Sequence, residues 1–594
     1  MLPDDVKLYL VDDFHTAEKL FHWMGERGQE RHIAVDTETT GLVIGKDRVR
    51  LAQIGGATAG FAIPWDGWHG LFADVIKRYE GRIDMHNAKF DAGMLSHCGV
   101  DIPRGQIDDT RIMSHIVEPN YSTALKTQSA RHVDHDAALA QESLHKAIGP
   151  RGKWDWDTVP ITFGPYWQYG ALDTVLTWHL REFHEPTVRE QAWESYELEL
   201  AVTWIIEKME RNGVYIDVPY ALEQKRRFDN YVEQADKWIW DTYKVKAGSN
   251  PAIVRILQDE GFSFSKATAS GAAALDKEVL GGLDHPLART VLQRRQLQKL
   301  SSTYLHHYTT EMDENWLIHP SINTLGARTG RMSMERPNMQ NLPRKSETNK
   351  AANEVRNCVA TRYRDGTGRL LMCDFDQIEM RLLAHLSGDP NLIAAFHGKD
   401  DFFINLARTV FDDPTISNKK DPRRSVTKSV GYAEIYGAGI AKMAQTAGVP
   451  EDQIRVVKSR WDASYPKVRA FKKSVENVAW ERQRSEGVPY ARSPLTGRRH
   501  PADTNKIYAL VNYLIQGSAA ETFKRKLVEL DLAGLGDYLV LPVHDEVIGD
   551  FPEDVVPDAV ETLDRIMNDD TMYRVPITAS VSHGERWGLK EDWE

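Results

Sequence analysis

The chain has 594 residues, of which 41% are apolar and 27% charged, and its 74 basic and 86 acidic residues give a formal net charge of −12. This length suits about four domains of ~150 residues, and the ordinary composition excludes a mainly disordered or fibrous chain. The three cysteines have no C-x-x-C spacing, which argues against a disulfide framework or a structural zinc. No signal peptide is visible, and no apolar run approaches the ~18 residues of a membrane span, so we expect a soluble, cytoplasmic protein.

Acidic residues follow the first predicted buried strand, residues 33–35, which leads into Asp36 and Glu38. Side chains at i and i+2 of an extended segment point to one face, so these two carboxylates converge. Asp91 stands in HNAKFDAGML, and Asp173 shares a helix face with Tyr169 in YGALDTVLTWHL. A polar strand end explains the first pair alone. Four carboxylates and a phenol, however, can hold two Mg²⁺ ions and activate water against a phosphodiester.

This set resembles the 3′-to-5′ proofreading exonucleases that carry four acids and a tyrosine. Order and local spacing both fit, with Asp36 and Glu38 in the first motif, Asp91 in the second, and Tyr169 and Asp173 in the third. The resemblance implies that the four acids are catalytic metal ligands and that the Tyr169 phenol positions the attacking water.

A long amphipathic helix is predicted over residues 193–217, leading into a turn at Asn212 and Gly213. Because the exonuclease motifs end near residue 180, we place a domain boundary near residue 190. The segment from 218 to about 310 has helical periodicity and can lie against duplex phosphates. Basic stretches at residues 419–428, 496–500 and 523–526 suit nucleic acid, although solvated helix faces explain them equally well.

Two acidic strand ends recur in the C-terminal part. An apolar strand over residues 370–373 delivers Asp374, and the pattern becomes helical from Gln377. YLVLPVHDEVIGD, residues 538–550, sets Asp545 and Glu546 between two apolar runs, as at a hairpin turn. A solvated turn explains the hairpin alone. If one sheet brings Asp374 and Asp545 together, they would form a second two-metal site.

A stripe of cations and aromatics is predicted on the helix in RRSVTKSVGYAEIYGAG, residues 423–439. Arg424, Lys428, Tyr432 and Tyr436 recur every four residues, so they share one slowly drifting face. Its charged end can bind phosphates and its aromatic end can stack on a base. An exposed amphipathic helix is the alternative, but it does not explain two tyrosines in line with the cations.

These blocks resemble the A-family DNA polymerases, the family of bacterial DNA polymerase I. DFDQIEMR matches the first palm motif, the stripe matches the fingers helix, and HDE matches the second palm motif; ARTGRMSMERPNMQNLP, NYLIQGSAAETFK and SHGERWG are also similar. The resemblance implies an α/β multidomain fold, with an RNase H-like 3′-5′ exonuclease domain at 1–190 and a right-hand polymerase domain at 191–594. Within the latter we expect a thumb at about 218–310, a palm at about 311–390 and 486–594, and fingers at about 391–485.

The resemblance also implies residue roles. Asp374 and Asp545 would bind two Mg²⁺ ions, with Mn²⁺ an open alternative, and Glu546 would support them. Lys428 would grip the triphosphate and donate a proton to pyrophosphate, and Glu379 would exclude ribonucleotides at the sugar 2′ position. The remaining nucleotide contacts would come from Arg424, Tyr432, Tyr436 and Gln377.

Primer-template DNA and deoxynucleoside triphosphates are the expected partners of a monomeric chain. Arg331, Asn341, Asn512 and Gln516 would meet the minor groove of the new base pair, where acceptors common to every correct pair test geometry without reading sequence. His544 would contact the primer end. Accessory replication proteins are not readable from the sequence.

Four residues depart from the family pattern. Asp376 stands where Ser is usual, Phe402 and Phe403 lie near a usual His, and Tyr508 replaces an Arg. None removes a metal ligand. Family members carry either Phe or Tyr at the position of Tyr432, whose hydroxyl can replace a hydrogen bond lost with the nucleotide 3′-OH, so we expect weak discrimination against dideoxynucleotides.

The order of the motifs resembles polymerases of bacterial viruses, since the exonuclease motif at residue 36 leaves no room before it for a 5′ nuclease domain. A viral protein of this kind would work in the host bacterial cytoplasm. Two alternatives stay open: a nuclease whose C-terminal part only holds DNA, and a non-enzymatic replication scaffold. Intact Asp374, Lys428 and Asp545 argue against the first, and the three acidic N-terminal motifs argue against the second.

Overall fold

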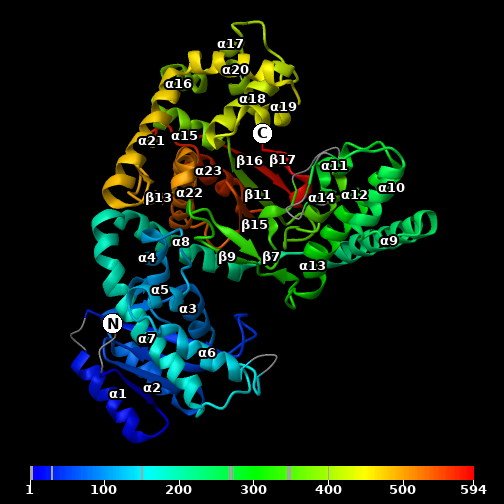
Figure 1. Cartoon of the computed structure of the whole chain (residues 1–594). Helices are drawn as coiled ribbons and strands as arrows, with labels where there is room; N and C mark the ends of the chain where they lie inside the picture. Colours follow the sequence, from blue (N-terminus) through cyan, green and yellow to red (C-terminus); the bar gives the residue numbers. More distant parts are fainter. Residues whose placement is uncertain are drawn as a thin grey trace.

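The computed structural model describes residues 5–27, 31–148, 152–264, 266–267, 271, 273–343, 349–398 and 401–593. Figure 1 shows an N-terminal α/β body, coloured blue to cyan, next to a central sheet formed by segments far apart in the sequence. Two groups of helices, within residues 218–300 and 390–464, extend from this central region in different directions. In the described part of the chain, no helix is long and apolar enough to cross a bilayer.

The N-terminal body is built on a six-stranded sheet in the order β1-β4-β3-β2-β5-β6. β2 (His32–Thr39) lies in the middle, antiparallel to β3 (Val49–Gly55) and parallel to β5 (Arg82–Met85). The other elements of this body are β1 (Lys7–Leu10), β4 (Ala59–Pro64), β6 (Ile107–Asp109), α1 (Phe14–Arg27), α2 (Trp65–Arg78), α3 (Ala88–His97), α4 (Thr110–Val117), α5 (Leu125–His132), α6 (Ala137–Ala147) and α7 (Gly164–Gln191).

Helices cover both faces of this sheet, as two neighbouring residues of β4 show. Phe61 packs on Trp23 of α1, with ring centroids 5.3 Å apart. Gly60 faces the other way, against α7, and a Cβ there would lie 2.1 Å from the carbonyl oxygen of Ala171. Successive side chains of a strand point to opposite faces, so α1 and α7 lie on opposite sides of the sheet. Burial on both faces explains why β2 begins as an uninterrupted apolar run.

The central sheet is antiparallel, in the order β14-β15-β11-β16-β17. β14 and β15 form the predicted hairpin, joined by residues 544–545, and the positive φ of 60° at His544 gives the tight turn. The strands are β11 (Gly368–Phe375), β14 (Leu539–Val543), β15 (Glu546–Pro552), β16 (Ala579–Gly584) and β17 (Glu591–Asp592). Helix α23 (Val556–Met567) packs on this sheet, α22 (Leu510–Leu532) packs on α23, and α15 (Ile378–Ser387) packs on α22.

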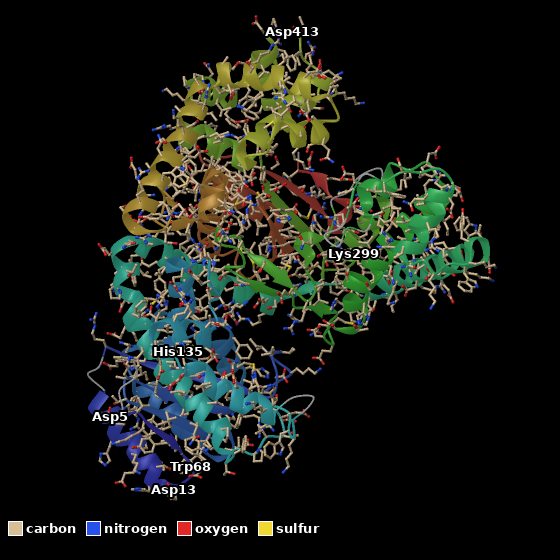
Figure 2. The ribbon with its side chains drawn as sticks, viewed as in Figure 1. Asp5, Asp13, Trp68, His135, Lys299 and Asp413 are labelled. Atoms are coloured by element: carbon tan, nitrogen blue, oxygen red, sulfur yellow. The ribbon has the colours of Figure 1, made fainter. Side chains whose placement is uncertain are left out.

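Two helical groups flank the central sheet. The first has its own apolar core and comprises α9 (Val218–Tyr243), α10 (Asn250–Asp259), α11 (Lys277–Gly281) and α12 (Pro286–Leu300). The second comprises α16 (Pro390–His397), α17 (Phe402–Phe411), α18 (Pro422–Tyr436), α19 (Ile440–Ala447) and α20 (Glu451–Ser464), and α21 (Pro466–Glu486) returns from it. Figure 2 places Asp413, after α17, at the end of the molecule opposite Asp13 and Trp68.

Short elements complete the fold around the central sheet. β7 (Val214–Tyr215) pairs with β8 (Leu317–Ile318), β9 (Ser321–Asn323) with β10 (Ser333–Glu335), and β12 (Tyr490–Arg492) with β13 (Arg499–Pro501). Two short helices are α13 (His306–Thr310) and α14 (Lys350–Arg356). The largest apolar core runs from residue 202 to residue 587, whereas a separate core spans residues 11–107.

The predicted helix after the N-terminal body is α8 (Trp193–Asn212), which ends at Gly213 because that residue takes a positive φ of 67°. A break at Ala192 separates α8 from α7. The domain boundary near residue 190 and the subdomain limits stay predictions.

A buried ionic network joins α8 to both parts of the molecule. Lys524 of α22, 1% exposed, donates to both carboxylate oxygens of Glu199, at 2.8 and 2.6 Å, and to two carbonyls of the loop 324–330, each at 2.8 Å. Arg498 donates to Glu199 at 2.8 Å and to His115 Nδ1 of α4 at 2.6 Å. Burial, with the charge of Arg498, lowers the pKa of His115 well below its usual value, so the ring is a neutral acceptor.

Candidate active sites and family membership

The structure brings the four N-terminal acids together beside the end of β2. Glu38 and Asp36 come from β2, Asp91 from α3 and Asp173 from α7. Asp91 and Asp173 are 3% and 4% exposed. After burial, repulsion from Asp91, Asp173 and Glu38 raises the pKa of Asp36, so all four acids share one electrostatic environment. The four acids thus lie close enough to interact electrostatically, and their role as metal ligands stays a prediction.

Burial is the first cause of the raised pKa at each of these carboxyls, and repulsion within the cluster adds to it at Asp36 and Glu38. The pKa values of Asp36 and Glu38 lie well above their usual range, and that of Asp91 is raised to about 7 even though Thr37 Oγ1 donates to it at 2.6 Å. Carboxylates held this closely together need cations to ionise.

Sequence reasoning missed a lysine in this cluster. Lys126, on α5 and 6% exposed, forms an ion pair with Asp173, and its Nζ lies 4.2 Å from the ring centroid of Tyr169. Burial raises the pKa of the Tyr169 phenol, and repulsion from Asp173 and Glu38 raises it further, so the phenol stays protonated. The only signal for Lys126 in the sequence is a lone cation in a helix, a pattern that usually marks a solvated face.

The chemistry of this cluster fits a divalent cation. All four acids supply oxygen ligands, which Mg²⁺ prefers, and their mutual repulsion is relieved by positive charge. Across the described ranges, as the side chains stand, no three His, Cys, Asp or Glu residues form a ready ligand group. Lys126 currently supplies the neighbouring positive charge.

The second acidic site lies at one end of the central sheet. Asp374 of β11 pairs in register with Glu546 of β15, and the backbone N–H of Phe375 donates to the carbonyl of Asp545 at 3.3 Å. Asp374, near the C-terminal end of β11, and Asp545, just before the antiparallel β15, therefore stand at the same end of the sheet, as the sequence predicts. Lys590 Nζ donates to Glu546 Oε1 at 2.7 Å, so this acid, 7% exposed, is already bound on one side.

The predicted stripe of α18 faces an aromatic ring and an acid that the sequence analysis did not assign to it. Arg424 makes a two-pronged ion pair with Asp401, at 2.8 and 2.9 Å. Lys428 Nζ lies 5.3 Å from the ring centroid of Phe403, and the Tyr432 ring lies 5.9 Å from the same ring. Phe403 thus lies between the cationic and aromatic parts of the stripe. To bind a phosphate, the Arg424 guanidinium must either contact Asp401 and the phosphate together or release Asp401.

Glu379 joins the stripe to the base of the central sheet. The Tyr436 hydroxyl donates to Glu379 Oε2 at 3.0 Å, and Arg331 forms an ion pair with the same carboxylate. Burial, followed by the charge of Glu379, raises the pKa of Tyr436, while a hydrogen bond with Gln516 opposes the rise. Gln377 takes a left-handed conformation with φ 57° just before α15. Four of the predicted nucleotide and DNA contacts therefore lie in one region: Arg331, Glu379, Tyr436 and Gln516.

The comparisons with known proteins decide the family. The model of DNA polymerase family A matches residues 219–589. The chain belongs to DNA polymerase family A. It is 27% identical to a DNA polymerase of Mycobacterium phage D29, with 95% of this chain and 94% of the relative covered. It is 29% identical to DNA polymerase I of Chloroflexus aurantiacus, with 84% of this chain and 54% of the relative covered.

A solved structure shows the same fold. The POL domain of Pol1 from M. smegmatis, in complex with DNA primer-template and dNTP, superposes with a TM-score of 0.80 at 22% identity, with 98% of this chain and 100% of that chain covered. The family prediction and the polymerase fold are therefore confirmed. This chain is a DNA-directed DNA polymerase of family A.

The departures of this polymerase from its family pattern have local structural partners. Asp376 accepts hydrogen bonds from Thr578 Oγ1 and Ser580 Oγ, each at 3.1 Å, so hydroxyls of the neighbouring strand hold the extra charge. Tyr508, 55% exposed, covers the end of α18, where a Cβ on Gly437 would lie 3.2 Å from the tyrosine ring. The substituted side chains are thus built into the fold.

The other predicted DNA contacts of the polymerase, besides Arg331, lie on three elements. Asn512 and Gln516 lie one turn apart on α22, and Asn512 is 8% exposed. Asn341 is exposed and ends the short helix Met339–Asn341, and Gln340 Nε2 donates to the carbonyl of Pro542 in β14 at 3.2 Å. This contact places Asn341 near the hairpin that carries His544. Their roles toward DNA stay predictions.

Proposed function

We propose that this polymerase extends a primer by two-metal-ion catalysis at Asp374 and Asp545 and removes 3′ nucleotides at the N-terminal cluster of Asp36, Glu38, Asp91 and Asp173. The single observation that supports both activities is the presence of two separate carboxylate sites on two different sheets. Family membership favours this reading over a nuclease that only holds DNA and over a scaffold.

At the polymerase site, the ends of β11 and β15 hold the two acids toward the primer end. Bound Mg²⁺ would lower the pKa of the primer 3′-OH and neutralise the pyrophosphate. Lys428 and Arg424 bind the triphosphate, Arg424 by sharing Asp401, and Lys428 donates a proton to the leaving pyrophosphate. Tyr436 and Arg331 fix Glu379 where it crowds the sugar 2′ position.

At the exonuclease site, Tyr169 and Lys126 act together. Bound Mg²⁺ would activate the attacking water and stabilise the leaving oxygen. The phenol stays protonated and orients that water by hydrogen bonding, while the ammonium of Lys126 holds Asp173 and the ring in place. The chain is proposed to act as a monomer on primer-template DNA.

The test is to follow a labelled primer on a DNA template with Mg²⁺, with and without deoxynucleotides. Wild type should extend the primer when nucleotides are present and shorten it when they are absent. Asp545→Ala should lose extension by at least about 10³-fold and keep shortening, and Asp36→Ala should do the reverse. A wild type that shortens primers and never extends them would establish the nuclease alternative, and one that never shortens them would remove the exonuclease.

A further inference from the structure

A cavity of about 530 Å³ lies between the N-terminal sheet and α8, away from both acidic sites. Five arginines line it: Arg31, Arg82, Arg104, Arg181 and Arg189. Among the described residues of its lining, only Asp108 and Glu197 are acidic. A volume of this size is within the range of small-ligand sites.

The cavity stands at the edge of the sheet opposite the exonuclease cluster. Arg31 precedes β2 and Arg82 begins β5, whereas Asp36 lies in the second half of β2. Five residues of extended chain separate Arg31 from Asp36, roughly 16 Å at about 3.3 Å per residue. A ligand in this cavity therefore does not occupy the metal cluster.

Two of these arginines pair with acids that are more buried than they are. Arg82 makes a two-pronged pair with Asp108, at 2.8 and 2.7 Å; its side chain is 39% exposed and that of Asp108 is 2% exposed. Arg189 pairs with Glu185 at 2.6 Å, with exposures of 49% and 11%. Arg82 also donates to the carbonyls of Gly105 and Ile107, whereas Arg104, 33% exposed, has a longer ion pair with Glu207, at 3.6 Å. Arg104 and Arg189 therefore offer N–H groups that suit an anion.

Aromatic rings give the cavity flat surfaces as well as charge. The guanidinium carbon of Arg104 lies 4.3 Å from the ring centroid of Trp204, and that of Arg189 lies 4.1 Å from Trp193. A guanidinium stacked on one side by tryptophan offers its other face to a second planar group, such as a nucleobase, and its edge to a phosphate. Cations and planar groups in one small cavity match a mononucleotide better than an inorganic anion.

We propose that this cavity, the α8 pocket, is a binding site for a nucleoside phosphate, separate from both active sites. The phosphate binds the exposed guanidinium edges of Arg104 and Arg189, and the base extends the stack on Trp204 or Trp193. The ligand touches the N-terminal body, through Arg104 and Arg189, and α8, through Trp193 or Trp204. This inference does not depend on the exonuclease, because a nucleotide reaches the pocket as either a polymerase substrate or an excision product.

The test is equilibrium binding of dAMP to the full chain in EDTA, which removes metal-dependent binding at the acidic sites. The variants are Arg104→Gln, Arg189→Gln and the double variant. The control is Arg78→Gln, an arginine of α2 that is 71% exposed, pairs with Asp74 at 3.5 Å and does not line the pocket. Circular dichroism and the thermal midpoint of each variant establish that it is folded.

Wild type and Arg78→Gln should bind dAMP saturably at one site with equal affinity. Each single variant should bind several-fold more weakly and the double variant at least tenfold more weakly, because each loses a charge-assisted hydrogen bond. Competition by dATP and by dGMP then distinguishes the source: stronger displacement by dATP assigns the pocket to the polymerase substrate, and stronger displacement by dGMP assigns it to the product of excision.

Three results would overturn the proposal. The first is the absence of saturable dAMP binding by wild type, and the second is wild-type affinity in the folded double variant. The third is competition by pyrophosphate that is as strong as competition by dAMP. A single-stranded oligonucleotide that displaces dAMP far more tightly than dATP or dGMP would also contradict a mononucleotide site and point to a strand-binding surface.

Discussion

The two acidic sites differ in how their charge is balanced. The N-terminal cluster gathers four carboxyls with raised pKa values around one buried lysine, whereas two acids around the polymerase site, Glu546 and Glu379, each pair with a separate cation. Lys590 donates a hydrogen bond to Glu546, and Arg331 forms an ion pair with Glu379. The first site therefore depends on added positive charge more strongly than the second, and its activity should respond more to the loss of a nearby cation.

The largest effect is expected in the buried ionic network of Lys524 and Glu199, which joins the two parts of the molecule that carry the two sites. Lys524→Met leaves Glu199 buried with one cation fewer, which should lower the free energy of unfolding by about 3–5 kcal/mol. Both activities should then decline together on heating. Lys208→Met, which breaks a half-buried bridge to Asp531, should cost at most about 1 kcal/mol. Denaturant unfolding measures both, and equal stability of the two variants would show that the network is not a structural joint.

The next effect is a pH dependence confined to the N-terminal cluster. Burial raises the folded-state pKa of Asp91 to about 7, above its ordinary value near 3.9, so the folded chain binds the proton more tightly than the unfolded chain between about pH 4 and pH 7. Without divalent cations, stability should therefore fall as pH rises through this window, by roughly 2–4 kcal/mol.

Unfolding in EDTA at several pH values checks this dependence. Asp91→Asn should flatten the profile between pH 4 and pH 7, while Asp101→Asn, at an exposed acid bound by Ser96, should leave it unchanged. Mg²⁺ should restore stability at the upper end of the window in wild type. A profile that is the same in wild type and Asp91→Asn would contradict the assigned environment of Asp91.

A smaller effect distinguishes the two sites directly. Lys126→Met removes the cation beside Asp173 and Tyr169, so primer shortening should fall 10- to 100-fold while extension is kept. Lys153→Met is the matched control, because this exposed lysine also lies over an aromatic ring, Trp154, at 4.9 Å but outside the cluster. Equal shortening by wild type and Lys126→Met would show that the lysine does not serve this site.

The smallest effect sharpens the polymerase site alone. Tyr432→Phe removes one hydroxyl beside the ring of Phe403, and discrimination against dideoxynucleotides should rise by about tenfold, the value of one hydrogen bond. Competition between dideoxy and normal nucleotides in primer extension measures it. The same discrimination in wild type and Tyr432→Phe would end the idea.

Local pattern predicted the acids, because strand ends and helix faces are encoded within a few residues. Asp374 and Asp545 follow from the ends of apolar runs, Asp36 and Glu38 from the period of two in a strand, and the stripe of α18 from a period of about four. The partners of these residues were missed, since Asp401 binds Arg424 across 23 residues and Lys524 binds Glu199 across 325. No local pattern records such pairs. The α8 pocket was missed for the same reason, because its five arginines come from four separate segments of the chain.

The most direct test of two independent sites uses one primer with a mismatched 3′ end, together with Mg²⁺ and all four deoxynucleotides. Wild type should first remove the mismatch and then extend to full length. Asp36→Ala should extend a matched primer at the wild-type rate yet stall on the mismatched one, and Asp545→Ala should only shorten both. Full-length product from the mismatched primer with Asp36→Ala, at the wild-type rate and with the mismatch removed, would contradict the assignment of excision to the N-terminal cluster.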